Sequence, residues 1–171
     1  MINTRAWLAI SHHTAFRCGG WAYVTTSGGA LVGAVGGERR ITRARTAMLG
    51  VEAALRSLTA QGAAAPGAAI YTLDAELITL APALDMPQSP LALAAQALRD
   101  TYAGDDATLW TQIGKAMTAS RAALRPFAPP TGPMADFIIA WAELAQDKAK
   151  ATGAFTAAIP KNNLSKLKEP T

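Results

Sequence analysis

The order of apolar and polar positions in the first forty residues predicts three consecutive β-strands. Residues 5–10 form a short apolar run typical of a buried strand, and residues 20–26 (GWAYVTT) alternate in the manner of a second strand. Ser-Gly-Gly at 27–29 supplies a turn, because glycine accepts the positive φ that tight hairpins require. A third strand begins at Ala30 (ALVGAVG) and is expected to run antiparallel to the second.

Beyond residue 42 the apolar positions recur every three and four residues, which predicts a helix with one buried face over about 43–60. Thr42 is the expected N-cap of this helix. Residues 70–73 favour a further strand. The remaining expected elements are helices over about 89–102 and 108–120, a short strand near 121–130, and a last helix over about 134–150. This order predicts an α/β fold with a mixed sheet and helices packed on its faces.

The composition limits the classes of protein that the chain can belong to. Half of its 171 residues are apolar and 16% are charged, so we expect a folded globular protein that buries its own core. The net charge of +4 is compatible with an anionic partner without requiring one. Cys18 is the single cysteine and cannot form an internal disulfide, which favours a reducing compartment. No stretch has the pattern of a signal peptide or a membrane span, so we expect a cytoplasmic protein with no membrane partner.

Five phrases in the chain, taken in order, resemble the ribonuclease H family. ISHHTAFRCGGWAYV resembles that family's first strand, its glycine-containing loop and the start of its second strand, and TRARTAMLGVEAAL resembles its first helix. IYTLDAELI, DATLWTQIGKAMTA and ADFIIAWAELAQDKAKA are similar to a later strand and two later helices. The resemblance implies a ribonuclease H-like domain over residues 1–150, with three antiparallel strands followed by helix-separated strands. Residues 151–171 would form a basic C-terminal tail, with lysines at 161, 166 and 168.

In that family, four carboxylates converge on two Mg²⁺ ions that activate water and stabilise the leaving oxygen of a phosphodiester. The matching positions in this chain carry no carboxylate. They are Ser11 (or its neighbour His12), Ala47, Leu73 and Ala142. If the match is right, these four side chains should lie together in space. Asp74 is a remnant acid one residue beyond the third position, and it should point to the opposite side of the strand from Leu73. We therefore expect no catalytic residue, no metal site and no cofactor, with Mg²⁺ relevant only if rearranged acids restore a site.

Histidines and arginines are the other candidates for chemistry. Ser11, His12 and His13 mark the end of the first strand, where neighbouring side chains point to opposite faces and no partner has the spacing of a zinc site. A structural role is favoured for them over a metal-binding one. A cluster of four arginines lies between the third strand and the first helix. It could contact phosphates without reading sequence, or it could be solvated surface. Its members are Arg39, Arg40, Arg43 and Arg45.

Three hypotheses for function follow. The preferred one is a catalytically inactive ribonuclease H-like protein that acts as a nucleic-acid-binding or scaffold module. The first alternative is an active, Mg²⁺-dependent endonuclease that cleaves RNA in RNA–DNA hybrids with a rearranged set of acids. The second is a purely structural subunit of a larger assembly. Nucleic acid and a protein assembly are thus the two expected kinds of partner.

Overall fold

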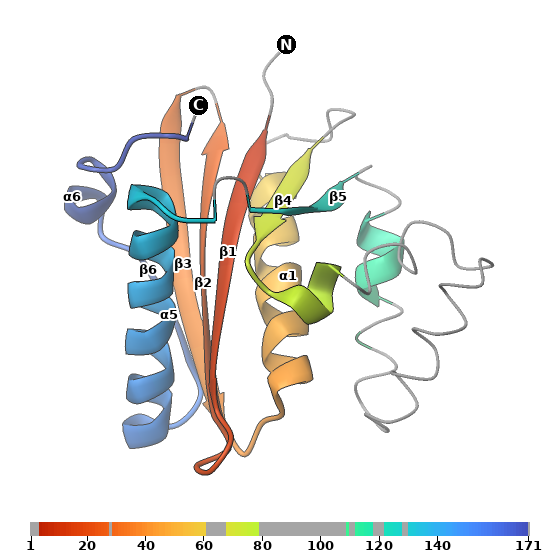
Figure 1. Cartoon of the computed structure of the whole chain (residues 1–171), viewed down its shortest axis with the longest axis vertical. Helices are drawn as coiled ribbons and strands as arrows, with labels where there is room; N and C mark the ends of the chain where they lie inside the picture. Colours follow the sequence, from red (N-terminus) through yellow and green to blue (C-terminus); the bar gives the residue numbers. More distant parts are fainter. Residues whose placement is uncertain are drawn as a thin grey trace.

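The computed structural model forms one six-stranded sheet with helices on both faces (Figure 1). It describes residues 4–27, 29–60, 68–78, 109, 112–117, 122–127 and 130–170. The strands are β1 (Arg5–His13), β2 (Cys18–Ser27), β3 (Ala30–Arg39), β4 (Ala69–Thr72), β5 (Ala123–Pro126) and β6 (Phe155–Ala158). The labelled helices are α1 (Arg43–Ala60), α5 (Pro133–Thr152) and α6 (Lys161–Leu164). Residues 75–78 and 112–117 are also helical.

The strand order across the sheet is β5-β4-β1-β2-β3-β6. Strands β1, β2 and β3 form an antiparallel meander, and β6 pairs antiparallel with β3 at one edge. Strand β4 runs parallel to β1, and β5 runs parallel to β4 at the other edge. This arrangement confirms the predicted mixed sheet and α/β class. None of the described helices is long and apolar enough to cross a membrane.

Helix α1 lies where the apolar spacing predicted it. The N–H of Arg45 donates to the Thr42 hydroxyl at 3.1 Å, so Thr42 is the N-cap. The strands of the meander are longer than their apolar runs, because the backbone ladder continues into polar sequence as far as the pairs His13↔Cys18 and Cys18↔Arg39. The helix expected over 89–102 lies outside the described residues.

The structure describes residues 151–170, and they include a strand of the sheet in the segment where a basic tail was expected. Helix α5 continues to Thr152, and β6 then extends the sheet. Leu164 is buried in the core on the α5 face. Near the C-terminus, Glu169 forms an ion pair with Arg5 of β1. The lack of periodicity from which a tail was expected did not reveal β6, because this strand forms by pairing with β3.

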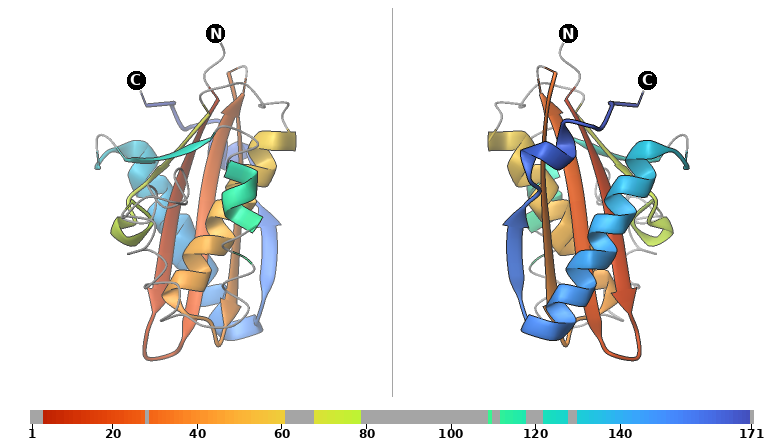
Figure 2. Two further views of the ribbon diagram at one scale, coloured as in Figure 1. Left: turned by 90° about the vertical axis from the view of Figure 1, so that its right-hand side faces the viewer. Right: turned by 90° about the vertical axis from the view of Figure 1, so that its left-hand side faces the viewer.

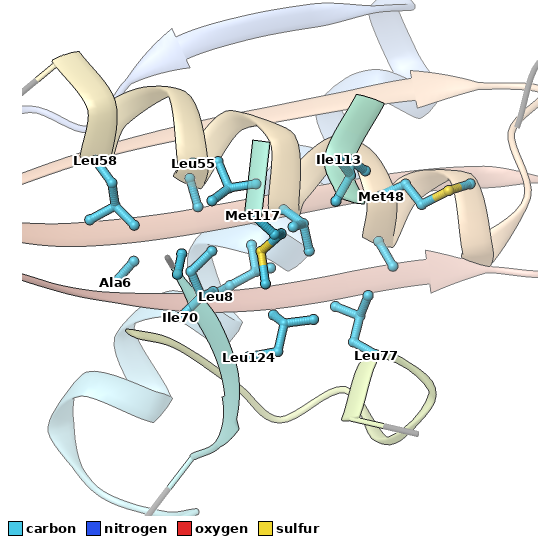
Figure 3. Packing of buried hydrophobic residues seen from close by; sticks show 14 of the residues in the cluster. Ala6, Leu8, Met48, Leu55, Leu58, Ile70, Leu77, Ile113, Met117 and Leu124 are labelled. Atoms are coloured by element: carbon cyan, nitrogen blue, oxygen red, sulfur yellow. The ribbon is translucent and has the colours of Figure 1, made fainter. Parts of the chain in front are cut away.

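The sheet separates two hydrophobic cores, one under α1 and one under α5. Figures 1 and 2 show these two helices on opposite faces of the sheet. Ala6 and Leu8 of β1 belong to the α1 core, where Leu8 lies among Met48, Leu55 and other aliphatic side chains (Figure 3). Trp7 and Ala9 belong to the α5 core. The period of two along β1 thus assigns each residue to one face of the sheet.

Helix α5 lies directly against strand β2 because Gly20 has no side chain. A Cβ at residue 20 would lie 2.3 Å from the backbone N of Gln146 and 2.5 Å from the carbonyl O of Ala142. Both are backbone atoms of α5, so neither can move away without moving the helix. The Gly19-Gly20 pair, which resembled a family phrase, therefore has a packing role on both faces, since a Cβ at Gly19 would lie 2.1 Å from Oγ1 of Thr46 in α1.

We expect Gly20→Ala to lower the free energy of unfolding by about 2–3 kcal/mol, because the added methyl displaces helix backbone. Gly50→Ala in α1 is the matched control. Its methyl would meet the flexible ends of Ile10 and Leu8, at 2.9 and 3.0 Å, and the Cβ of Trp21 at 3.1 Å, and none of these is helix backbone, while helix propensity improves. Urea denaturation of both variants measures the difference. Equal stability of the two variants would contradict the close packing at Gly20.

Candidate functional site

Asp74, the acid one residue beyond the predicted position Leu73, follows the end of β4 on the α1 side of the sheet. One oxygen of its carboxylate, Oδ2, forms an ion pair with the guanidinium of Arg43 in the first turn of α1. The other oxygen, Oδ1, accepts the N–H of Leu77 at 3.0 Å. The Asp74 side chain is only 2% exposed. It therefore caps the helical turn over residues 75–78 and joins that turn to α1.

Both oxygens of the buried Asp74 carboxylate interact with groups of the protein itself. A buried carboxylate is tolerated when its oxygens are paired and hydrogen-bonded, and removing the partner of such a group is costly. The Asp74 side chain is buried, and each of its oxygens has a partner within the protein. This remnant acid thus has a structural explanation in the Arg43 ion pair.

The four predicted positions do not converge on one point, which corrects the expectation from the sequence. Ala47 is buried in the core under α1. The hydroxyl of Ser11 donates to Oε1 of Gln146 on α5, at 2.6 Å, so Ser11 lies on the opposite face. Leu73 and Ala142 also belong to the α5 face. Leu73 and Asp74 do point to opposite sides, as strand geometry predicted. Of the two residues weighed at the first position, His12 shares the face of Ala47.

The two histidines of β1 contact different elements. His12 Nε2 lies 2.8 Å from the carbonyl O of Ile41, so the ring fixes the loop between β3 and α1. His13 Nδ1 accepts the N–H of Phe16 at 3.4 Å, within the β1–β2 hairpin. Among the residues that the structure describes, no three His, Cys, Asp or Glu side chains are grouped so that they could hold a metal ion.

Two arginines face each other where the β2–β3 ladder ends. The last pair of the ladder is Cys18↔Arg39, and the next residues outward are Arg17 and Arg40. The N–H of Ile41 donates to the carbonyl O of Arg17 at 3.0 Å, which holds the two segments together. Arg17 and Arg40 have φ of 49° and 54°, a left-handed conformation that is uncommon for residues other than glycine. Such backbone strain concentrates at functional sites.

Further cations reach the same end of the molecule. The guanidinium of Arg39 lies against Gly153, which follows the last turn of α5. The Nζ of Lys150 in α5 lies 3.5 Å from the centroid of the Phe16 ring. Figure 1 shows the β1–β2 hairpin, the start of α1 and the end of α5 together at the lower end of the molecule. We call the group Arg17, Arg39, Arg40 and Lys150 the basic end.

The structure divides the four arginines that the sequence singled out. Arg39 and Arg40 are exposed, and within the described residues neither has an ion pair. Arg43 is engaged by Asp74, and Arg45 is half-buried in the first turn of α1. Sequence reasoning missed Arg17 and Lys150. The antiparallel pairing of the second and third strands was a signal for Arg17, since it brings the start of one strand to the end of the other.

A groove of about 570 Å³ lies elsewhere, between α1 and the edge formed by β3 and β6. The stacked rings of Trp21 and Tyr23 line it, with Leu49 and Ala53 from α1. The charged groups on its lining include Glu52 and Arg56, which pair with each other. Its apolar lining offers no arrangement of groups for catalysis.

No protein-family model and no curated protein sequence matches the chain. Solved structures match it in fold. The N-terminal ribonuclease H domain of a Mycobacterium tuberculosis protein, solved as a fusion with maltose-binding protein, is 15% identical with a TM-score of 0.61, over 88% of this chain and 97% of that chain. RNase H1 of the halophilic archaeon Halobacterium salinarum is 16% identical with a TM-score of 0.58, over 86% of this chain and 99% of that chain. The chain therefore has a ribonuclease H-like fold.

We expect Arg43→Ala to lower the free energy of unfolding by about 2–3 kcal/mol, because it leaves the buried Asp74 carboxylate without its ion pair. Arg40→Ala is the control, since an exposed arginine with no ion pair in the described chain should change stability by only about 0.5 kcal/mol. Asp74→Asn should cost less than Arg43→Ala, because the amide keeps an acceptor for Leu77 and carries no charge. Equal denaturation midpoints for Arg43→Ala and Arg40→Ala would refute the structural role of Asp74.

Proposed function

We propose that this chain is a ribonuclease H-like protein that binds nucleic acid and does not cleave it. The observation that carries the proposal is the basic end, where three exposed arginines and a lysine come together from three separate segments of the chain. Its members lie on the β1–β2 hairpin, at the end of β3 and at the end of α5. Arginine and lysine supply most of the affinity of proteins for the phosphate backbone.

The arrangement of Arg17 and Arg40 supports a bound anion. Both residues lie just beyond the last pair of the β2–β3 ladder, so two positive charges share this end of it, and both have a left-handed backbone. A phosphate placed between them would offset that charge. Guanidinium groups suit this role, because their planar N–H donors match phosphate oxygens in pairs.

The absence of cleavage is proposed from the arrangement of the acids that the structure describes. Mg²⁺ requires several oxygen donors of high charge at one point. Asp74 is buried and engaged at both oxygens. A nuclease mechanism would need acids that the described part of the chain does not group together.

The proposed binding is independent of base sequence. The cations of the basic end are positioned for backbone phosphates, and contacts of that kind fix orientation without discriminating bases. A cytoplasmic location is part of the proposal and is supported by a single, unpaired and buried cysteine, Cys18. If the protein does not bind nucleic acid, the remaining hypothesis is a scaffold role.

We expect affinity for nucleic acid to fall steeply with salt, because each bound phosphate releases counterions. The double variant Arg39→Ala/Arg40→Ala should reduce the slope of log affinity against log salt by about 1.4–1.8, since each phosphate that is no longer bound lowers the slope by about 0.7–0.9. Fluorescence anisotropy at several salt concentrations measures this slope. The reduction should be similar for oligonucleotides of different sequence.

The control is Arg56→Ala/Arg125→Ala, which removes the same charge from exposed positions on α1 and β5 and should leave the slope unchanged. A slope that falls equally in both double variants would show that net charge alone, and not the basic end, determines binding. No binding of single strands, duplexes or hybrids at low salt would overturn the proposed function.

A further inference from the structure

Phe16 lies at the tip of the β1–β2 hairpin with 57% of its surface exposed. The hairpin turn covers residues 14–17, between the last residue of β1 and the first of β2. Polar residues and glycine are the usual occupants of such turns. An aromatic ring that remains exposed in a turn gains no stabilisation from burial. More than half of the surface of Phe16 is therefore open to a ligand.

The ring of Phe16 has two close neighbours, the ring of His13 and the ammonium group of Lys150. The His13 ring centroid lies 4.7 Å away at an interplanar angle of 51°. The backbone N–H of Phe16 also donates to His13 Nδ1, which joins the base of the turn to its tip. The Lys150 ammonium lies 3.5 Å from the ring centroid. Phe16 therefore has a defined place, next in the chain to Arg17 of the basic end.

An aromatic ring beside a group of phosphate-binding cations is the arrangement with which proteins bind single strands. The π-face of every base can stack on an aromatic side chain, and cations along the backbone supply the electrostatic attraction. Bases within a duplex are stacked on both faces and cannot offer one to a protein ring. The Lys150 contact with Phe16 lies at the protein surface, so the flexible lysine chain can turn to a phosphate as a base takes its place.

We propose that Phe16 is a stacking platform for one unpaired nucleobase, and that the ligand of the basic end is single-stranded or locally unpaired nucleic acid. This inference rests on the proposed function, because the arginines supply the phosphate contacts beside which the base is stacked. It adds a ligand class that the arginines alone do not determine. The contact requires a base and is indifferent to which base it is.

The test compares two probes with the same phosphates, an oligothymidylate and an abasic strand of equal length, in an anisotropy titration at low salt. The wild-type protein should bind the strand that carries bases about 5-fold or more tightly. Phe16→Ala should remove this preference and keep the salt dependence, whereas Phe16→Tyr should retain it. Val32→Ala is the matched control, because Val32 is 48% exposed and lies near the other end of β3.

The titration tests base stacking on Phe16 separately from phosphate binding by the basic end. A preference for bases that disappears in Phe16→Ala and persists in Val32→Ala supports the stacking platform. Equal binding of both probes, or a preference unchanged in Phe16→Ala, overturns the platform and leaves phosphate binding intact. No binding of either probe by the wild-type protein overturns the proposed function itself. An unchanged melting temperature in Phe16→Ala confirms that the variant is folded.

Discussion

The alternation of side chains along β1 and β2 places one set of residues beneath α1 and the other beneath α5. Both faces are filled by packed cores, so a shift of register by one residue would bury the wrong set on each face. This constraint decides where the candidate residues of β1 point. It places Ser11 against Gln146 of α5, whereas His12 contacts the loop that leads into α1. It also brings Arg17 opposite Arg40 where the ladder ends.

Arginines that are close together in the sequence differ in their surroundings: Arg43 pairs with Asp74, and the arginines of the basic end are exposed. Arg43 compensates a buried carboxylate and joins α1 to the end of β4, so its contribution is to stability. Arg39 and Arg40 precede it by a few residues and remain exposed. Because the likeness to solved ribonucleases H shows the fold alone, function has to be argued from these side chains. The proposed phosphate binding rests on the exposed pair, Arg39 and Arg40.

Local sequence predicted the elements whose apolar pattern is strong. Helix α1 was placed well because its apolar residues recur at three and four, and Thr42 has the usual N-cap chemistry. Strand β6 was missed because its four residues are ordered by pairing with β3, more than a hundred residues earlier. The same reason applies to the site. Arg39 and Arg40 are adjacent and were found, whereas Arg17 and Lys150 join them only through strand register and the end of α5. The Arg43 partner of Asp74 is 31 residues away in sequence.

The central claim is that this ribonuclease H-like fold binds a nucleic acid and leaves it intact. The most direct measurement incubates a labelled RNA–DNA hybrid that has a single-stranded overhang with the protein in Mg²⁺ and in Mn²⁺ at low salt. The bound fraction and the length of the RNA strand are followed in the same samples. The account predicts a bound hybrid whose RNA is not shortened. Cleavage of the RNA that disappears in Asp74→Asn would contradict it and establish a rearranged catalytic site around that acid.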